Sequence, residues 1–448
     1  MRRILHTFFI LYLAMLPANA EQLNFNDFLS TALSNSYKVK IAEINKNITQ
    51  RGVKEARAAY FPTISAFATT ERYNDLTNGG APLTAVGNEI FLNRDYYQDM
   101  AALGLSYNLF DFGVRKRQLD IAKADNKQKE ILLKKNTRDL KLDIVELYAQ
   151  TLALYKQSQI KNDELNLRDE LREINKKLRL AGEISEIDVV DSEIKASETK
   201  SELDEIKNRF AKKLTEISFY TNKAYDIKDI ELTNFPLDVN NIPTEVDPFV
   251  KLSAQVNNLI VENSVEAKVY DLEILKKQKE YEIQKKYNFP KIRFDTRYNL
   301  YGSDTNNFFD GIGDISQRSL SFRLSTSFVL FDGFKNINTV AKSKMEVEKL
   351  KVEKEEQLAE LRKKYEQVQL DSKNALIQSE NNEKTLALVD KNLQMLENLN
   401  ANGIIEKSAC IKKQLELLDK KMKLEQTQIN IFVTQYKLQV LSDEKVEL

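Results

Sequence analysis

The longest regular pattern in the sequence is a helical one near its C-terminal end. Over Leu358–Leu396, positions separated alternately by three and four residues are apolar or small. This spacing predicts a coiled-coil seam on a long α-helix. Shorter seams of the same kind cover Leu140–Leu154 and Leu415–Tyr436. The middle of the longest seam, Ser372–Asn382, is small or polar, which indicates either a close approach of two helices or a face open to water.

A second pattern, strict alternation of apolar and polar residues, predicts β-strands with one apolar and one polar face. It covers Ile292–Leu300, Leu320–Leu330 and Leu103–Leu109, and is weakest over Thr63–Tyr73. Strands of about ten residues with this alternation are typical of a membrane β-barrel, which turns apolar residues to lipid and polar residues to its lumen. A soluble sheet would alternate as well, but the sequence offers no spare apolar helix to cover one.

The two kinds of element occur twice in the same order. Three short motifs recur, two of them 221 residues later and one 228 residues later: Leu109–Asp111 as Leu330–Asp332, Ala181–Gly182 as Asn402–Gly403, and Phe61–Pro62 as Phe289–Pro290. Repetition at a fixed offset indicates duplication. We therefore predict a mainly α-helical chain built from a duplicated helix-strand-strand-helix-helix repeat.

The motifs also place the boundaries of the two repeats. We expect the first repeat at residues 21–220, with strands near 63–74 and 99–110 and helices near 113–180 and 185–220. We expect the second at 251–448, with strands near 290–302 and 317–331 and helices near 334–401 and 404–440. Residues 221–250 contain three of the seven prolines and form the connector. At roughly 1.5 Å per residue, each long helix would span on the order of 100 Å.

Residues 1–20 have the features of a secretory signal peptide. Arg2 and Arg3 precede the apolar run Phe8–Leu16, and Ala18–Ala20 provides a small-x-small cleavage site. The next residue is Glu21 rather than cysteine, so we expect no lipid anchor there. No later stretch approaches 18 consecutive apolar residues, so we expect no transmembrane helix. The protein is then either soluble outside the cytoplasm or crosses an outer membrane as β-strands.

The composition argues against catalysis and against nucleic-acid binding. Lysine plus arginine equals aspartate plus glutamate at 67 each, so there is no basic excess for nucleic acid. His6 is the only histidine and falls in the signal peptide, and Cys410 is the only cysteine. Serine–histidine, cysteine–histidine and histidine–metal sites are therefore not expected in the mature chain, nor is an intrachain disulfide. Carboxylate pairs are expected by chance among 67 acidic residues. We predict no enzyme, no cofactor and no metal site.

Four strands in one chain cannot close a barrel, because the smallest barrels need about eight. An open strand edge is not tolerated in lipid, since its backbone groups would lack hydrogen-bond partners. We therefore expect several copies of the chain to share one barrel. The strand count alone allows two, three or more copies.

The ordered landmarks resemble the TolC family of outer-membrane efflux proteins, also called outer membrane factors, over essentially the whole mature chain. They are Ala59–Pro62, Leu109–Gly113 and Leu180–Ser185 followed by Asp188, then Phe289–Pro290, Leu330–Gly333 and Asn402–Gly403. The resemblance implies a homotrimer with a 12-stranded β-barrel in the outer membrane and a coiled-coil α-helical barrel extending into the periplasm. It also implies docking on a periplasmic adaptor and an inner-membrane pump, as the passive exit duct of a tripartite efflux or type I secretion system.

The resemblance also indicates a docking site where the long helices turn back. Glycine permits the positive φ that ends one helix and starts the next. We predict that the two turns contact the adaptor through seven residues: Leu180, Ala181, Gly182, Ser185, Asn402, Gly403 and Ile404. Asp188 and Glu406 are predicted to ring the pore entrance with negative charge and so to favour cations. Cys410, just beyond the second turn, is predicted to be a packed small residue.

This sequence departs from the family at the second turn. The Thr/Arg/Thr stretch that often follows the family's glycine is replaced by Ile404–Glu406. The arginine and tyrosine that usually pair with the aspartate at position 188 are replaced by Ile405 and Asn400. The family's closing latch is therefore not carried over to this chain. The alternative function is a soluble periplasmic coiled-coil scaffold.

Overall fold

The computed structural model describes residues 21–73, 83–85, 88–90, 96–227, 230–235, 261–304, 310–313 and 315–442. The predicted signal peptide and most of the predicted connector lie outside these ranges. The chain divides into two compact units. Unit 1 comprises Met1–Glu43, Ile131–Lys268 and Glu355–Leu448, and unit 2 comprises Ile44–Glu130 and Val269–Lys354.

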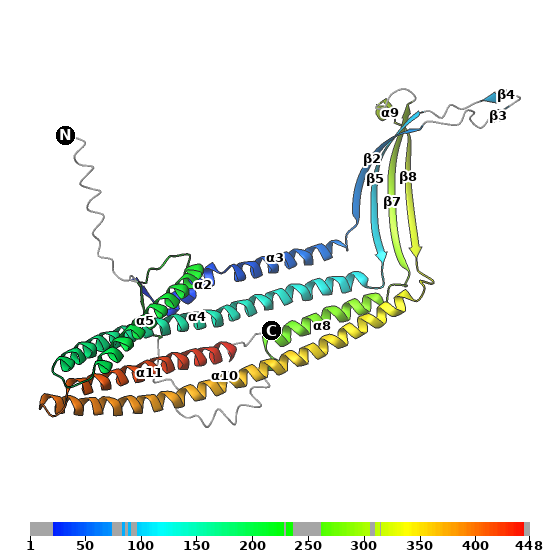
Figure 1. Cartoon of the computed structure of the whole chain (residues 1–448). Coiled ribbons are helices and arrows are strands. Elements are labelled where there is room, and N and C mark those ends of the chain that lie inside the picture. Colours follow the sequence, from blue (N-terminus) through cyan, green and yellow to red (C-terminus); the bar gives the residue numbers. More distant parts are fainter. Residues whose placement is uncertain are drawn as a thin grey trace, which may run out of the picture. The chain divides into compact units, whose positions relative to one another are not determined.

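The duplicated order of elements is present in the structure (Figure 1). The long helices α4 (Val114–Leu180) and α10 (Lys335–Ala401) each have 67 residues. The helices that follow them, α5 (Glu186–Thr221) and α11 (Lys407–Ser442), each have 36 residues. Because all four boundaries recur with the offset of the sequence motifs, the two repeats have the same helical backbone. None of the helices in the described part of the chain has both the length and the apolar character needed to cross a membrane.

Shorter helices precede the strands of each repeat. The first repeat has α2 (Phe25–Asn35) and α3 (Tyr37–Ala58), and the second has α8 (Val265–Gln284). Asn24 is the N-cap of α2, and its side-chain oxygen accepts a hydrogen bond of 2.8 Å from the backbone N–H of Asp27. Such a cap satisfies one of the backbone donors left free at a helix start.

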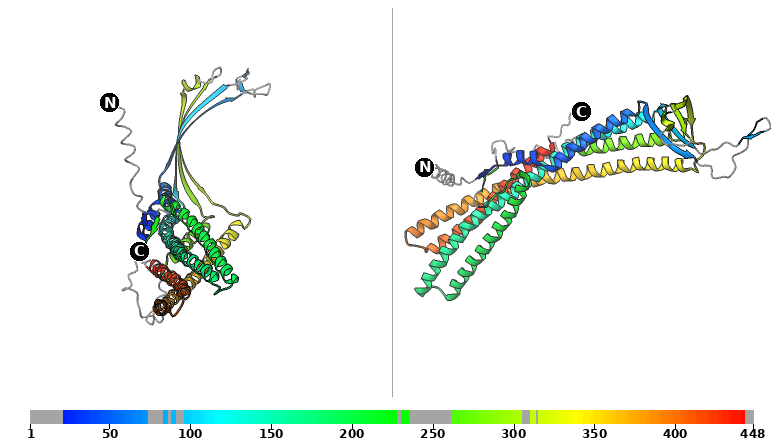
Figure 2. Two further views of the ribbon diagram at one scale, coloured as in Figure 1. Left: turned by 60° about the vertical axis from the view of Figure 1, so that its left-hand side comes forward. Right: turned by 90° about the horizontal axis from the view of Figure 1, so that it is seen from above.

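The four long strands of unit 2 form one antiparallel sheet (Figures 1 and 2). They are β2 (Thr63–Tyr73), β5 (Tyr96–Phe110), β7 (Lys291–Asp304) and β8 (Ile315–Ser327), in the order β2-β5-β7-β8. The central pairing joins β5 of the first repeat to β7 of the second. Within the described residues, β2 and β8 each have one edge without a partner strand.

The register confirms the alternation predicted from the sequence. On one side of the sheet, Phe294 lies opposite Leu324 and Tyr298 opposite Leu320. The β8 residues of this apolar face, Leu320, Phe322 and Leu324, are 60%, 68% and 69% exposed in the single chain. The other side, the polar face, carries Arg293, Asp295, Arg297 and Arg323. The sheet therefore leaves a row of large apolar side chains uncovered.

Strand β8 is shorter than the predicted 317–331. It ends at Ser327, which pairs with Lys291, the first residue of β7. Residues 328–331 therefore have no β7 backbone to pair with, although they continue the apolar pattern. Alternation alone does not report where the neighbouring strand begins.

Several short elements were not predicted. Strand β1 (Glu21–Leu23) pairs in parallel with β6 (Ile230–Leu232), which lies in the predicted connector. The short strands β3 (Leu83–Ala85) and β4 (Asn88–Ile90) pair with each other, and α9 (Asp310–Gly313) lies between β7 and β8 in the chain. These elements have three or four residues, too few for a period to be recognised.

An aromatic cluster in unit 1 surrounds Tyr148 of α4. The Tyr148 side chain is fully buried, and its hydroxyl lies 2.9 Å from the Leu23 carbonyl oxygen and 2.7 Å from that of Thr233. Burial raises the pKa of Tyr148 to about 12. Rings from α2, α11 and the connector pack around it: Phe25, Phe28, Phe235, Phe432 and Tyr436. The Tyr148 hydroxyl thus contacts the last residue of β1 and the residue directly after β6.

The predicted coiled-coil seam is buried where α10 belongs to unit 1. Ser372, Ala375 and Ser379 are buried, and Asn382 donates a hydrogen bond of 2.9 Å to the Thr427 hydroxyl on α11. The small and polar middle of the seam therefore packs against a helix and is not a face open to water.

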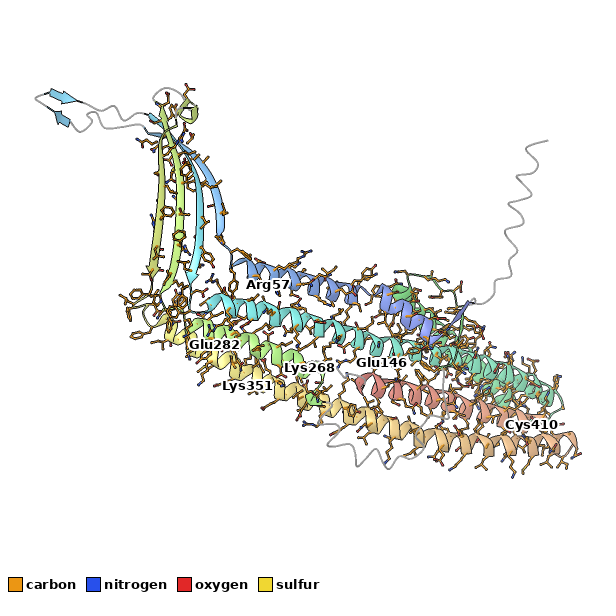
Figure 3. The ribbon with its side chains drawn as sticks, turned by 180° about the vertical axis from the view of Figure 1, so that it is seen from behind. Arg57, Glu146, Lys268, Glu282, Lys351 and Cys410 are labelled. Atoms are coloured by element: carbon orange, nitrogen blue, oxygen red, sulfur yellow. The ribbon has the colours of Figure 1, made fainter. Side chains whose placement is uncertain are left out.

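Ion pairs tie helices together within each unit. In unit 1, Arg138 of α4 lies 2.5 Å from Glu266 of α8. Burial alone raises the pKa of Glu266, but the hydrogen bond and charge of Arg138 outweigh it and hold that pKa below its ordinary value. In unit 2, Arg117 of α4 lies 2.7 Å from Glu282 of α8, which is labelled in Figure 3.

Candidate docking surface at the helical turns

The first turn, residues 181–185, reverses the chain between α4 and α5. Gly182 has φ +78°, in the left-handed region that favours glycine. Its N–H donates to the Arg179 carbonyl at 3.0 Å, and the N–H of Glu183 donates to the Leu178 carbonyl at 2.9 Å. This pair of bonds is the Schellman motif, which satisfies carbonyls left free at a helix end. The predicted role of Gly182 as the residue that ends α4 is consistent with this geometry.

The start of α5 carries a reciprocal capping box. Ser185 accepts a hydrogen bond from the Asp188 N–H at 3.3 Å, and the Asp188 carboxylate accepts from the Ser185 N–H at 3.0 Å and its hydroxyl at 2.7 Å. These side-chain and backbone bonds from Ser185, helped by the charge of Lys412, lower the pKa of Asp188. Asp188 therefore remains ionised and, besides any role at a pore entrance, caps its own helix.

The second turn, residues 402–406, has the same backbone. Gly403 has φ +70°, its N–H donates to the Asn400 carbonyl at 2.9 Å, and the Ile404 N–H donates to the Leu399 carbonyl at 2.9 Å. The Asn400 side chain adds a bond of 2.8 Å to the Ile405 carbonyl. The equivalent of Ser185 here is Glu406, whose carboxylate accepts from the Ser408 hydroxyl at 2.9 Å.

The two turns lie close together within unit 1. A groove of about 240 Å³ is lined by residues from both helical hairpins and contains both Asp188 and Glu406. Lys407 at the start of α11 lies 2.5 Å from Glu170 of α4. The rest of the groove is mixed in character: Arg168, Leu171, Asn175, Leu178, Ile184, Asp191, Ser192, Lys195, Ser408 and Lys412. The two acids predicted for the pore entrance are thus brought together, beside basic groups.

All seven residues predicted to contact an adaptor are exposed. Leu180 is 89% exposed and Ile404 is 66% exposed, so each turn presents one large apolar side chain. A methyl group added at Gly182 or Gly403 would meet no atom within 4 Å. The backbone at both turns is therefore open to an approaching partner.

Sequence reasoning missed an apolar stripe beside the first turn. Ile187 is 71% exposed, and Val190 and Ile194 continue the stripe along α5. Their spacing of three and four residues was the available signal. The opposite seam of α5, from Val189 to Ile217, is buried, so the helix has two apolar sides.

Cys410, on the first turn of α11, is 5% exposed, which confirms that it is packed (Figure 3). Within the residues that the structure describes, no group of three or more histidine, cysteine, aspartate or glutamate side chains is placed to hold a metal ion. The surface at the turns is therefore one of apolar side chains, open backbone and mixed charge.

The fold matches solved outer-membrane channels along nearly the whole chain. The Campylobacter jejuni CmeC outer membrane channel aligns with a TM-score of 0.78 and 14% identity, covering 95% of this chain and 87% of that one. The Vibrio cholerae outer membrane protein VceC gives 0.73 and 13%, covering 93% and 96%. CusC, whose crystal structures concern transmembrane channel formation, gives 0.75 and 14%, covering 93% and 92%. At these identities the likeness shows the fold.

The sequence adds a family match over the first repeat. No curated protein sequence matches the chain. Residues 28–223, which are almost the whole first repeat, match the family described as outer membrane efflux protein. The second repeat has the same helical backbone as the first, and the channel fold covers both. The first repeat therefore matches the outer membrane efflux protein family, and the whole chain has the fold of outer-membrane channels.

Proposed function

We propose that this protein is the passive exit duct of a tripartite efflux or type I secretion system, working as a homotrimer in the outer membrane. The observation that carries the proposal is the sheet of unit 2. It has an apolar face, a polar face and two edges without partner strands among the described residues. Such a sheet is one part of a barrel that only further copies can complete.

Three copies fit the strand count. Open backbone edges are costly in lipid, so β2 of one copy must pair with β8 of the next. Two copies would give the smallest barrel known, which side chains fill, whereas three give twelve strands and room for a duct. The apolar face, with Phe322 and Leu324, then meets lipid, and the polar face lines the lumen.

The helical turns would face the periplasmic partners. Leu180 and Ile404 offer exposed apolar anchors next to open backbone at Gly182 and Gly403. We assign the adaptor contact to the seven exposed turn residues, and the inner-membrane pump supplies the energy. Three copies of Asp188 and Glu406 would surround the pore entrance and favour cations there. The cargo would be drugs or secreted proteins.

Cysteine crosslinking tests the shared barrel. In a Cys410→Ala background no native thiol remains, so Thr69→Cys on β2 can be combined with Ser319→Cys, Ser321→Cys or Ser325→Cys on β8. Several β8 positions are tested because the register between copies decides which pair is close. Oxidation should give covalent trimers for at least one pair.

The matched control is a pair that the structure already places opposite each other. Ala102→Cys on β5 and Asn299→Cys on β7 should crosslink within one chain and leave the mass of a monomer. If the control pair forms its disulfide while every β2–β8 pair leaves the protein monomeric in membranes, the proposal of a shared barrel is wrong.

The docking role is tested by placing a charge at the turns. Leu180→Glu and Ile404→Glu should abolish photo-crosslinking to a periplasmic adaptor while trimers still form. Lys391→Glu adds a negative charge on the exposed side of α10 away from the turn and should leave crosslinking unchanged. If crosslinking is unchanged in both turn variants, Leu180 and Ile404 do not contact the adaptor and belong to the turns alone.

A further inference from the structure

The two faces of the sheet carry different charge. Along the strands, the polar face has four basic side chains, Lys291, Arg293, Arg297 and Arg323, and two acidic ones, Glu71 and Asp295. The apolar face has two of each sign, Arg72 and Arg318 with Asp99 and Asp304. Along the described strands, each chain therefore contributes an excess of two positive charges to the polar face and no excess to the apolar face.

Two of the arginines are held by neutral partners. The Arg293 Nε donates a hydrogen bond of 3.3 Å to the Asn108 side-chain oxygen on β5. The guanidinium carbon of Arg297 lies 4.9 Å from the centre of the Phe67 ring on β2. A cation over an aromatic face is attracted by the ring quadrupole. These contacts orient the guanidinium groups without adding a negative charge, and Asp295 is the acidic residue between the two arginines on this face of β7.

Gly104 is the β5 residue that pairs with Arg297. It lies on β5 directly opposite Arg297, between β7 and β2. The Arg297 side chain crosses β5 to reach the Phe67 ring on β2. A Cβ at Gly104 would lie 3.4 Å from the Ser65 hydroxyl oxygen. The arginine is thus laid along the sheet surface.

The third arginine, Arg323, is exposed on β8 and lies opposite Asp295 in the register. Among the described residues, no carboxylate lies within the 4.0 Å of an ion pair from it. Arg293 and Arg297 lie on β7 on either side of Asp295, and Arg323 lies opposite Asp295 on β8. We call these three arginines the arginine belt.

We infer that the arginine belt is an anion-favouring section of the duct, acting on solutes with carboxylate or phosphate groups. The inference rests on the proposed function, because three copies and closure of the sheet are what turn the polar face into a lumen. A lumen with an excess of one charge and low-dielectric walls raises the local concentration of counter-ions. Rings of arginine are a common device of anion-selective pores. The belt is separate from the acidic pore entrance and opposite to it in sign.

The test is the reversal potential of the purified trimer in a planar lipid bilayer under a potassium chloride gradient. To remove the opposing filter, the comparison is made in an Asp188→Asn, Glu406→Gln background. Adding Arg293→Gln, Arg297→Gln and Arg323→Gln should shift the reversal potential towards that of potassium. The shift should be larger near 0.01 M salt, where the Debye length is about 30 Å, than near 1 M, where it is about 3 Å.

Two control variants separate charge from folding. Arg318→Gln removes the same charge from the apolar face of β8 and should leave the reversal potential unchanged. Arg323→Lys keeps the charge and should leave it unchanged as well. If the triple variant conducts with the same reversal potential as its background, the arginine belt does not favour anions. The proposed duct is unaffected by that result. A trimer that does not conduct in any form overturns the proposed duct, and the belt with it.

Discussion

The turn after α4 and the turn after α10 have the same backbone and different side chains. Both follow a 67-residue helix, both contain a glycine at positive φ, and both make the same pair of Schellman bonds. The residues that start the next helix differ, because Ser185 and Asp188 correspond to Glu406 and Ala409 in the second repeat. The two turns therefore share the glycine and the length of the preceding helix, and they differ in the capping box at the start of α5.

The helices after the turns show the same contrast. Phe210 of α5 and Ile431 of α11 occupy equivalent positions and are 1% and 5% exposed. Val189 corresponds in the same way to Cys410, and both are buried. Duplication has kept the seam positions buried while their side-chain volumes changed. Phe210 also belongs to the main buried cluster around Tyr148, to which α11 contributes Ile429, Phe432 and Tyr436.

The largest difference between the repeats should appear in their cores. Phe210→Ala should lower the free energy of unfolding by about 3–5 kcal/mol and Ile431→Ala by about 2–5 kcal/mol, since each leaves a cavity. We expect the first to be the larger, because Phe210 belongs to the main buried cluster. Urea unfolding of the detergent-solubilised protein measures both. An equal or smaller loss at Phe210 would show that the two cores are equivalent.

Substitution of the turn glycine should lower the free energy of unfolding equally in both repeats. Gly182→Ala and Gly403→Ala each place a Cβ in the left-handed region, at a cost of about 1–2 kcal/mol. No neighbour within 4 Å adds to that strain at either turn. The two losses should therefore agree, and thermal unfolding of the two variants checks this. A clear difference between them would mean that the turns are not equivalent.

Substitutions at the N-terminal caps of α5 and α11 should have opposite effects on stability. Ser185→Ala removes the N-cap of α5 and should cost about 0.5–2 kcal/mol. The double change Glu406→Ser, Ala409→Asp builds the same capping box at the start of α11 and should raise the free energy of unfolding by a similar amount. Hydrogen exchange at the first turns of α5 and α11 locates both effects. No gain in the double variant would show that Glu406 already caps α11.

The smallest expected effect is a dependence on pH at the first turn alone. The pKa of Asp188 is lowered in the folded protein. Its contribution to stability is therefore complete above its unfolded value of about 3.9 and is lost as the pH falls through the lower folded value. Protection of the α5 start relative to the α11 start should fall between about pH 5 and 2. Asp188→Asn should abolish that change, and a change that persists would belong to another acid.

Much of the fold was readable from the sequence because its signals are local. The three-and-four spacing of the α10 seam, the alternation in β7 and β8, and the glycines of the turns each depend on a few neighbouring residues. The exposure of the seven turn residues was predictable for the same reason. The capping box was predictable too, since a serine three residues before an acid is its signature, but Asp188 was assigned only to the pore entrance.

The tertiary structure decided the contacts between segments that lie far apart in the chain. The pairing of β1 with β6, the bonds of Tyr148 beside both, and the pairing of β5 with β7 join residues from different parts of the sequence. Periodicity gives each strand its two faces, but it does not name a neighbour. For that reason the sequence determined that Arg297 lies on the polar face, and only the register placed it opposite Gly104 with its guanidinium over Phe67.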